Sequence, residues 1–295
     1  MPTRTSGVLD HLEDTDLWRT RLGRRTVLTA SGAILAALTG CAPVLRASSL
    51  ATDSTDSNGI RHLSAHSIAG VAPAPAPYPI PPPRPGPAVF ISRGPDNTNT
   101  LALTIDDGTS AAVVAAYVAF ALETGFALTF FPNGSVRGNW ETRAHSLRPL
   151  IERGQVQIGN HTWSHVDLQK MNDTAIRADL ERNEQWIQST FGVTSRPWLR
   201  PPFGSRNTHT DGVAASLGFT HIVNWSGTFG DSGVKTAAQI LGAAGLYGHP
   251  GAIVLGHANH PAVTLLFDQL RAKFAAEGLT PVTLDQMFGT SRRVG

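Results

Sequence analysis

The sequence predicts an α/β domain with a parallel sheet or barrel over about residues 98–290, preceded by an export signal and a tether. Short apolar runs alternate with helical stretches along this region, which is typical of parallel α/β folds. A hydrophobic content of 41% is enough for a buried core. The segment before residue 98 is instead rich in small polar residues and proline and has no periodicity.

Charge and cysteine content exclude two classes of protein. The chain of 295 residues has 24 Lys and Arg against 22 Asp and Glu, a net charge of +2. We therefore exclude a nucleic-acid-binding protein, which needs a basic face to neutralise phosphates. The single cysteine excludes internal disulfides and multi-cysteine zinc modules. No apolar run reaches the roughly 18–20 residues that span a bilayer.

The first 40 residues resemble an export signal. Arg24 and Arg25 precede an uncharged apolar stretch, residues 26–39, which is too short for a comfortable transmembrane helix. The arginine pair resembles a twin-arginine signal, and Leu-Thr-Gly before Cys41 resembles a bacterial lipobox. This resemblance implies an acylated Cys41 and a lipoprotein at the outer face of the bacterial cell membrane, or else a protein secreted to the cell wall. A chance arginine pair and a buried free cysteine are the alternative.

Residues 41–97 are predicted to form a disordered tether rich in Ser, Thr and Pro. Nine of the fifteen residues 73–87 are proline. Such a run adopts extended polyproline II structure at about 3.1 Å per residue, so it predicts a stiff spacer. A ligand for a proline-recognising module is the alternative. Residues 291–295 are predicted to be a short tail.

Strands and helices are predicted in alternation within the domain. Two stretches have helical periodicity: residues 176–191, with Asn172 or Asp173 as N-cap, and residues 261–278, with proline in the first turn. Five apolar runs are predicted to be short buried strands, at residues 100–105, 127–131, 155–158, 221–223 and 253–255. In such folds reactive groups collect at the carboxyl ends of the strands.

Polar residues follow these strands. Asp106 and Asp107 directly follow the first strand, although Asp-Asp-Gly is also a common turn sequence. His161 and His165 follow the third strand and lie four residues apart, a spacing that can aim both rings at one zinc ion. One aspartate and two histidines leave a position open for water, as catalytic zinc sites do. Asp167 is predicted to cap the next helix or to brace a metal-binding histidine.

Two more residues complete an ordered set. Arg200 lies in a rigid Arg-Pro-Pro-Phe-Gly loop, and His257 follows the last strand. Alone, each is typical of a surface turn or a structural histidine. In order, Asp-Asp-Gly, His-Thr-x-x-His, Arg-Pro-Pro-Phe-Gly and Leu-x-His resemble the motifs of the polysaccharide deacetylase family (NodB homology, carbohydrate esterase family 4). The resemblance covers about residues 98–290 and implies a distorted (β/α) barrel of the NodB-homology type. The fourth motif departs from the family, because Asp231 is followed by Ser232 where tryptophan is common.

The resemblance also implies the chemistry of the site. Asp107, His161 and His165 would bind a divalent metal, and these ligand types suit Zn²⁺ or another divalent transition metal. Asp106 would be the general base that takes a proton from water. His257 would be the general acid that protonates the departing amine.

Five residues are assigned to substrate and support roles by the same resemblance. Arg200 would orient the base, and the main-chain N–H of Phe203 would hold the oxyanion. Leu255 would line the pocket for the acetyl methyl group. Asp231 would orient either the general acid or the arginine, and Trp225 would form a groove wall or pack in the core.

These roles imply a metal-dependent hydrolase that removes N-acetyl groups from a cell-wall glycan. The expected substrate is N-acetylglucosamine of peptidoglycan or a related N-acetylated polysaccharide, inferred from the predicted location. The expected partners are this glycan and the membrane, through the lipid anchor. We expect no nucleic-acid partner and a monomeric catalytic domain. The alternatives are removal of O-acetyl groups from acetylated glycans, and a surface glycan-binding protein with weakened catalysis.

Overall fold

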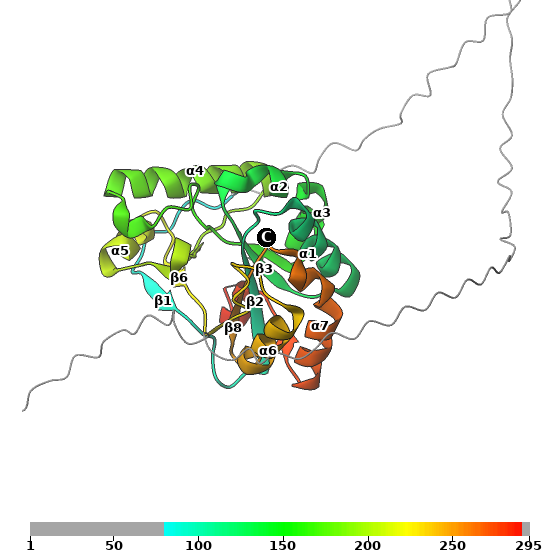
Figure 1. Cartoon of the computed structure of the whole chain (residues 1–295). Coiled ribbons are helices and arrows are strands. Elements are labelled where there is room, and N and C mark those ends of the chain that lie inside the picture. The colour runs from blue at the N-terminus through cyan, green and yellow to red at the C-terminus, as the bar shows by residue number, and fades with distance from the viewer. Residues whose placement is uncertain (1–79, 291–295) are drawn as a thin grey trace, which may run out of the picture. The chain divides into compact units, whose positions relative to one another are not determined.

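A computed structural model describes residues 80–290, in which helices surround a central group of strands (Figure 1). The strands are β1 (Val89–Ile91), β2 (Thr100–Asp107), β3 (Leu128–Pro132), β4 (Val156–Ile158), β5 (Trp198–Leu199), β6 (His221–Val223), β7 (Gly227–Thr228), β8 (Ile253–His257) and β9 (Thr280–Pro281). The α-helices are α1 (Ala111–Thr124), α2 (Arg137–Glu141), α3 (Ala144–Glu152), α4 (Asp173–Phe191), α5 (Thr208–Ser216), α6 (Ala237–Tyr247), α7 (Phe267–Ala276) and α8 (Leu284–Phe288). Short 3-10 helices are η1 (Gly134–Val136), η2 (Leu168–Lys170), η3 (Pro202–Gly204) and η4 (Pro261–Leu265).

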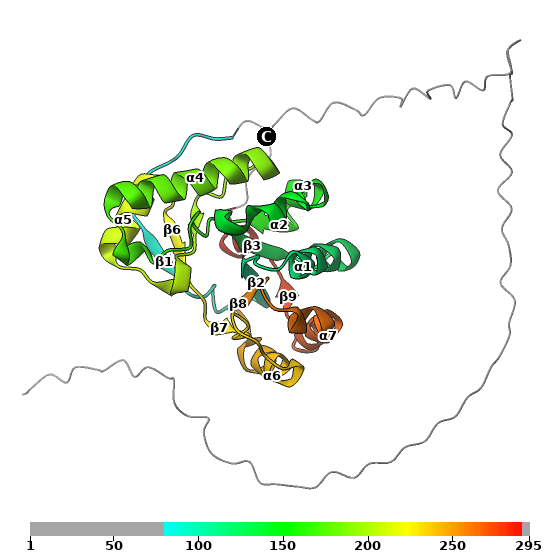
Figure 2. The ribbon, with the colours of Figure 1, turned by 45° about the horizontal axis from the view of Figure 1, so that its top comes forward.

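The strands form an open barrel. They lie in two parallel sheets, ordered β1-β6-β5 and β4-β3-β2-β8-β7, and β9 also pairs with β2. A bridge between Asn160 and Leu199 joins the sheets. Figure 2 shows α1, α4, α6 and α7 around the strands. This arrangement confirms the predicted parallel α/β barrel.

The barrel is open between β1 and β7, which do not pair within residues 80–290. Three residues of the β6–β7 connection span this opening. Asn224 N–H donates to Ile91 C=O at the end of β1 (2.8 Å), and Ser226 N–H donates to Ile253 C=O at the start of β8 (3.0 Å). Trp225 lies between these two anchored residues and packs against the apolar interior of the barrel.

The folded domain begins before the predicted boundary at residue 98, which is therefore wrong. Strand β1 pairs with β6 over residues 89–91, and Ile91 is buried. A three-residue strand behind a proline-rich run has too little periodicity to be recognised from sequence. The export signal with Cys41, residues 41–79 of the tether and the tail 291–295 lie outside the described residues. Among the helices of residues 80–290, none combines the length and hydropathy needed to cross a membrane.

The five predicted strands are all present, and one of the two predicted helices is correct. In α4, the Asn172 side chain accepts a hydrogen bond from Ala175 N–H, and Gly192 ends the helix with φ 77°. The second helix, predicted to be continuous over 261–278, is broken into η4 and α7. Thr264 Oγ1 donates to Pro261 C=O (2.7 Å), the carbonyl that an α-helix would offer to the next turn, and this competition favours the tighter 3-10 turn.

Side chains of β3 alternate between two cores. Phe130 faces outward, where it packs edge-on against Trp140 and Tyr117 in the large cluster beneath the helices. Phe131 faces inward with Trp198 in the cluster that fills the barrel. Period-two alternation of strand residues thus separates a helix-packing core from a barrel interior. The barrel interior also holds a charged residue, Arg200, which has no exposed surface.

Candidate active site

The predicted acid and base lie on neighbouring strands. Asp106 and Asp107 are the last residues of β2, and His257 is the last residue of β8. The parallel register pairs Asp106 with His257, and Ala258 N–H donates to Asp106 C=O (3.0 Å). Main-chain bonds therefore fix the spacing of these two residues at the carboxyl ends of the strands.

Asp107, His161 and His165 converge on one point. His161 Nε2 lies 3.4 Å and His165 Nε2 3.2 Å from Asp107 Oδ1, and one ligand atom from each residue lies within 4.8 Å of the others. Ligand atoms about 2.0–2.2 Å from a tetrahedral zinc ion lie roughly 3.4 Å apart, so the distances from Asp107 to the two histidines match those around such an ion. The structure thus brings together all three predicted metal ligands.

His161 is oriented so that Nε2 is the atom free to bind a metal. Its Nδ1 lies 2.7 Å from the main-chain oxygen of Arg200, a group that only accepts, so Nδ1 carries a proton and Nε2 is the nitrogen that would take the metal. Burial alone would lower the pKa of His161, but Asp106 and Asp107 outweigh it and raise this pKa. A metal ion bound at Nε2 would take the place of the proton that these two carboxylates favour there.

The Asp107 carboxylate is held by two asparagines. Asn259 Nδ2 donates to Oδ2 (2.8 Å), and Asn133 Nδ2 donates to Oδ1 (3.3 Å). Burial would raise the pKa of Asp107, but hydrogen bonds from His161, His165 and Asn259 hold it well below its usual range. The group is therefore a carboxylate, the form that binds metal.

The backbone after β2 turns sharply to present this carboxylate. Asp107 has φ 66° and Gly108 has φ 104°, and both lie in the left-handed region. Trp140 Nε1 donates to Asp107 C=O (2.8 Å), and a Cβ on Gly108 would collide with the Trp140 ring. The glycine that follows the two aspartates is thus required by a close approach of the indole.

Arg200 orients Asp106 from inside the barrel. Its Nη1 donates to Asp106 Oδ1 and to Thr104 Oγ1, both at 2.8 Å. Its Nη2 and Nε donate to the main-chain oxygens of Asn224 (3.1 Å) and Val223 (3.3 Å). Asp106 Oδ2 remains on the side of the metal ligands, 3.6 Å from His161 Nε2. The predicted contact of this arginine with the base is present.

Asp231 contacts His257 rather than Arg200, which resolves the two predicted alternatives. Asp231 Oδ1 lies 3.0 Å from His257 Nδ1, and Oδ2 accepts the main-chain N–H of His257 (3.2 Å). Burial would lower the pKa of His257, but Asp231, with Asp106 and Asp107, raises it above the usual value. The buried Asp231 therefore favours the protonated imidazole.

The three remaining predicted substrate residues have different surroundings. Phe203 has φ 61°, and its ring is 69% exposed and stands edge-on to the His165 ring at 4.8 Å. Trp225 is half-buried and contributes to the barrel cluster while it lies against Gly204. Leu255 is almost fully buried on β8, with 4% of its surface exposed. Phe203 is thus the apolar group that presents most surface beside the metal ligands.

Helix α4 supports the loop that carries both histidines. Asp179 Oδ2 accepts the N–H groups of Trp163 (2.8 Å) and Ser164 (3.3 Å). Asn183 Nδ2 donates to Asn160 Oδ1 (3.0 Å), which also accepts Thr162 N–H (2.8 Å). Of the two roles predicted for Asp167, the structure shows the cap: its side chain accepts Gln169 N–H at the start of η2.

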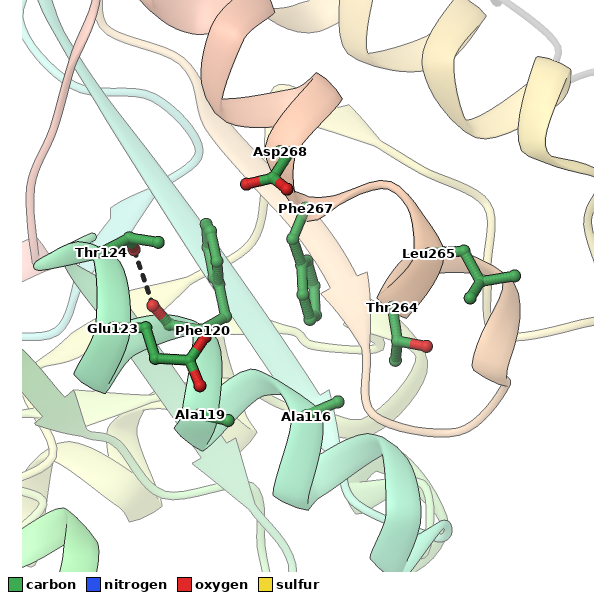
Figure 3. Close-up of a pocket in the computed structure, with 9 residues that line it drawn as sticks. All are labelled: Ala116, Ala119, Phe120, Glu123, Thr124, Thr264, Leu265, Phe267 and Asp268. Carbon is green, nitrogen blue, oxygen red and sulfur yellow. Dashed lines mark hydrogen bonds between the residues drawn. The ribbon is translucent and has the colours of Figure 1, made fainter. Parts of the chain in front are cut away.

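A hollow of about 320 Å³ lies elsewhere, between α1 and the segment from η4 to α7. The rings of Phe120 and Phe267 stack with their centroids 4.5 Å apart. Figure 3 shows both among the residues that line the hollow. None of the predicted site residues lines this hollow.

Sequence reasoning missed the asparagines that hold Asp107. Asn133 follows β3, and Asn259 lies two residues after His257, so both stand at strand ends, where functional groups were expected. Their positions at strand ends could have marked both asparagines as candidates for the site. Asparagine is also common in turns, however, and its residue type gives no sign of a ligand-holding role.

Comparisons with known proteins agree with this geometry. Residues 93–222 match the family described as polysaccharide deacetylase. The peptidoglycan-N-acetylglucosamine deacetylase PgdA of Listeria monocytogenes serotype 1/2a (strain 10403S) is 26% identical over 200 residues, which are 66% of this chain. The matched region spans only 40% of that relative's length.

Two solved structures share the fold. The Bc1960 peptidoglycan N-acetylglucosamine deacetylase, in complex with a naphthalenyl N-oxidanyl-benzamide, is 26% identical with a TM-score of 0.61 and matches over 68% of this chain and 94% of its own. The wild-type BA3943 protein of Bacillus anthracis, a CE4 family pseudoenzyme, is 21% identical with a TM-score of 0.60, over 68% of both chains. The second likeness concerns the fold alone.

Proposed function

The chain carries a polysaccharide deacetylase domain of the NodB type, and from this premise we propose that it is a metal-dependent hydrolase that removes N-acetyl groups from peptidoglycan N-acetylglucosamine. One observation carries the proposal. Three metal-ligand side chains, a carboxylate held by a buried arginine and a histidine held by a buried aspartate meet at one edge of the barrel. This combination supplies each group that amide hydrolysis needs.

Asp107, His161 and His165 would hold the metal ion. When bound, Zn²⁺ supplies a Lewis acid for the acetamide carbonyl and lowers the pKa of a coordinated water molecule. The protein contributes the ligand geometry and the orientation of His161.

Asp106 acts as the general base. Arg200 holds Asp106 Oδ1 at 2.8 Å, and Oδ2 lies on the side of the metal ligands. A proton taken from the attacking water would therefore be accepted at Oδ2. A donor fixed on Oδ1 also prevents rotation of the carboxylate during this transfer, which is the orienting role of the buried guanidinium.

His257 acts as the general acid. Asp231 fixes the proton on Nδ1 and raises the pKa of the ring, so the protonated form persists to higher pH than in a free imidazole. The proton given to the departing amine would come from Nε2. Protonation is needed because an amine is too basic to leave as an anion.

The substrate class is supported by relatives. PgdA and Bc1960 are both named peptidoglycan N-acetylglucosamine deacetylases. The BA3943 neighbour is named a pseudoenzyme, so the fold alone does not establish activity. In this chain all five residues of the proposed chemistry are present: Asp106, Asp107, His161 and His165 are in contact, and His257 pairs with Asp106 in the register of β8 and β2. This arrangement favours catalysis over glycan binding alone.

The expected result of the direct test is acetate release from N-acetylated glycan. The full chain is incubated with peptidoglycan and with N-acetylglucosamine oligomers, before and after chelation and with Zn²⁺ restored. Chelation should abolish release and Zn²⁺ should restore it. Asp106→Asn, which keeps the shape of the side chain but not its basicity, should lower kcat by at least about 10²-fold.

Parallel assays on O-acetylated glycans separate the main alternative. Release from esters but not from amides would refute N-deacetylation in favour of O-deacetylation. Release from neither, with tight glycan binding, would favour a glycan-binding protein. Unchanged turnover in Asp106→Asn would refute the role of that residue.

The location of the enzyme is a separate proposal. The predicted export signal and acylated Cys41 would hold the domain at the outer face of the membrane, where peptidoglycan is the nearest N-acetylated glycan. The proline-rich residues 73–87 would then serve as a spacer between anchor and domain. This proposal depends on the sequence alone.

A further inference from the structure

We propose that Asn259 is a positioning residue for the metal site, which selects the Asp107 oxygen that faces the metal. Its Nδ2 lies 2.8 Å from Asp107 Oδ2, while the other oxygen, Oδ1, faces the Nε2 atoms of His161 and His165. A carboxylate held through one oxygen presents the other in a fixed direction. This inference rests on the proposed function and deepens it by adding a residue outside the family motifs.

The orientation of the Asn259 amide is fixed by its other contacts. Asn259 Oδ1 accepts both the main-chain N–H of Thr109 (3.1 Å) and the Thr109 hydroxyl (2.8 Å). A main-chain N–H can only donate, so the oxygen of the amide must face Thr109. The nitrogen must then face Asp107, where it can only donate. A flipped amide would set two donors against each other at Thr109 and an oxygen against a carboxylate at Asp107.

Asn259 thus joins two strand ends through one side chain. It lies two residues after His257 on the β8 side and binds both the carboxylate and the turn that follow β2. The carboxylate is nearly buried, at 8% exposure, so water has little access to replace a lost donor. Without Asn259, Oδ2 would lose this donor, and rotation of the carboxylate would become easier. Partners of this kind are typically worth 10–100-fold in metal affinity.

A second asparagine offers a matched comparison. Asn139, on α2, donates Nδ2 to the main-chain oxygens of Gly108 (2.9 Å) and Thr109 (3.2 Å). It holds the same turn as Asn259 but makes no bond to the Asp107 carboxylate among the described contacts. A role in shaping the turn would apply to both asparagines, whereas control of the carboxylate belongs to Asn259.

The test compares Asn259→Leu with Asn139→Leu in the full chain. Leucine has the branched shape of asparagine without its polar atoms. Zn²⁺ affinity is measured by calorimetric titration of the metal-free proteins, and the Tm of each metal-free protein is measured alongside. We expect Asn259→Leu to raise the Kd for Zn²⁺ about tenfold or more and Asn139→Leu to change it less than about twofold. Acetate release by Asn259→Leu should recover at saturating Zn²⁺.

Several results would overturn the inference. A Kd for Asn259→Leu within about twofold of the unmodified chain would do so, as would equal losses in both variants. If Asn259→Leu does not fold, Asn259→Ala is measured against Asn139→Ala with the same expectations. Failure of the proposed function can be told apart from failure of this inference. If the unmodified chain binds Zn²⁺ but releases no acetate, deacetylation is refuted and the affinity comparison still decides the role of Asn259. If the unmodified chain does not bind Zn²⁺, both the proposed function and this inference are refuted.

Discussion

At the scale of single residues, Asp231 is the part of the divergent fourth motif that contacts His257, the proposed general acid. Its carboxylate holds both the ring and the main chain of His257, and the serine that follows it makes no part of this contact. The unusual residue at position 232 therefore alters the surroundings of the acid but not the contact that orients it. The sequence left open whether Asp231 supports the acid or the arginine, because each of these lies at the end of a strand, β8 or β5, and only distances in the structure tell which one Asp231 contacts.

The Asp231–His257 pair predicts a pH effect. A general acid is active while protonated, so kcat should fall as pH rises through the pKa of His257, which Asp231 raises. Asp231→Asn removes the negative charge and should lower that pKa, so the alkaline limb of the kcat profile should move to lower pH by about one unit. The measurement is kcat against pH with saturating Zn²⁺. Asp268→Asn, at the exposed start of α7, is the control. An unmoved alkaline limb would show that another group supplies the proton.

At the scale of elements, one face of α4 supports two separate parts of the site. Asp179 and Asn183 hold the histidine loop. One residue further, the fully buried Glu184 accepts hydrogen bonds from the side chains of Thr194 and Ser195 and from Ser195 N–H (3.0 Å). These residues precede β5, which leads to Arg200. A single helix therefore contacts both the loop that carries His161 and His165 and the segment that leads to Arg200.

This arrangement predicts that replacing Glu184 lowers the free energy of unfolding more than replacing Glu181, although both glutamates pair with Arg196. Arg196 pairs with Glu184 (2.9 Å), which is buried, and with Glu181 (2.7 Å), whose side chain is 34% exposed. Glu184→Ala should lower the free energy of unfolding by about 3–5 kcal/mol, because it removes the buried acceptor of the Ser195 donors and one of the two carboxylates that pair with Arg196. Glu181→Ala should cost about 1 kcal/mol or less, since water can replace it. Urea denaturation of both variants tests this, and similar costs would contradict it.

The length of a helix or strand determined whether the sequence could predict it. The long apolar β2 and the nineteen-residue α4 carry several periods of their pattern, so sequence located both. Strands β5 and β7 have two residues each, which is too few for any period. The break at Leu266 depends on one hydroxyl bond, which periodicity cannot express. The motif residues were found through the order of their types, whereas Asn259 acts through a contact between β8 and β2, which are neighbours in the sheet although the two contacting residues are 152 positions apart in the sequence.

At the scale of the whole domain, the proposed metal ligands come from the ends of two strands, β2 and β4, that are separated by β3. Asp107 ends β2, in the middle of its sheet, while His161 and His165 lie beyond β4 at the edge where the two sheets join. An ion bound only by the folded state would therefore stabilise the domain by mass action.

Metal removal should accordingly lower the melting temperature of the full chain. At free Zn²⁺ of about 100 times the Kd, the stabilisation is about 2.7 kcal/mol, or roughly 5–10 °C in Tm for a domain of this size. Thermal scans with chelator and with stepped Zn²⁺ measure it. Asp107→Asn should show a much smaller rise. A Tm of the unmodified chain that is independent of Zn²⁺ would contradict metal binding by the folded domain.

The buried position of Arg200 has a consequence for how such a domain can diversify. Besides Asp106, the guanidinium contacts the Thr104 hydroxyl and the main-chain oxygens of Val223 and Asn224. Changes in the side chains around the mouth leave those backbone acceptors in place. In the proposed glycan deacetylase, side chains at the rim can therefore differ while the buried guanidinium keeps these contacts.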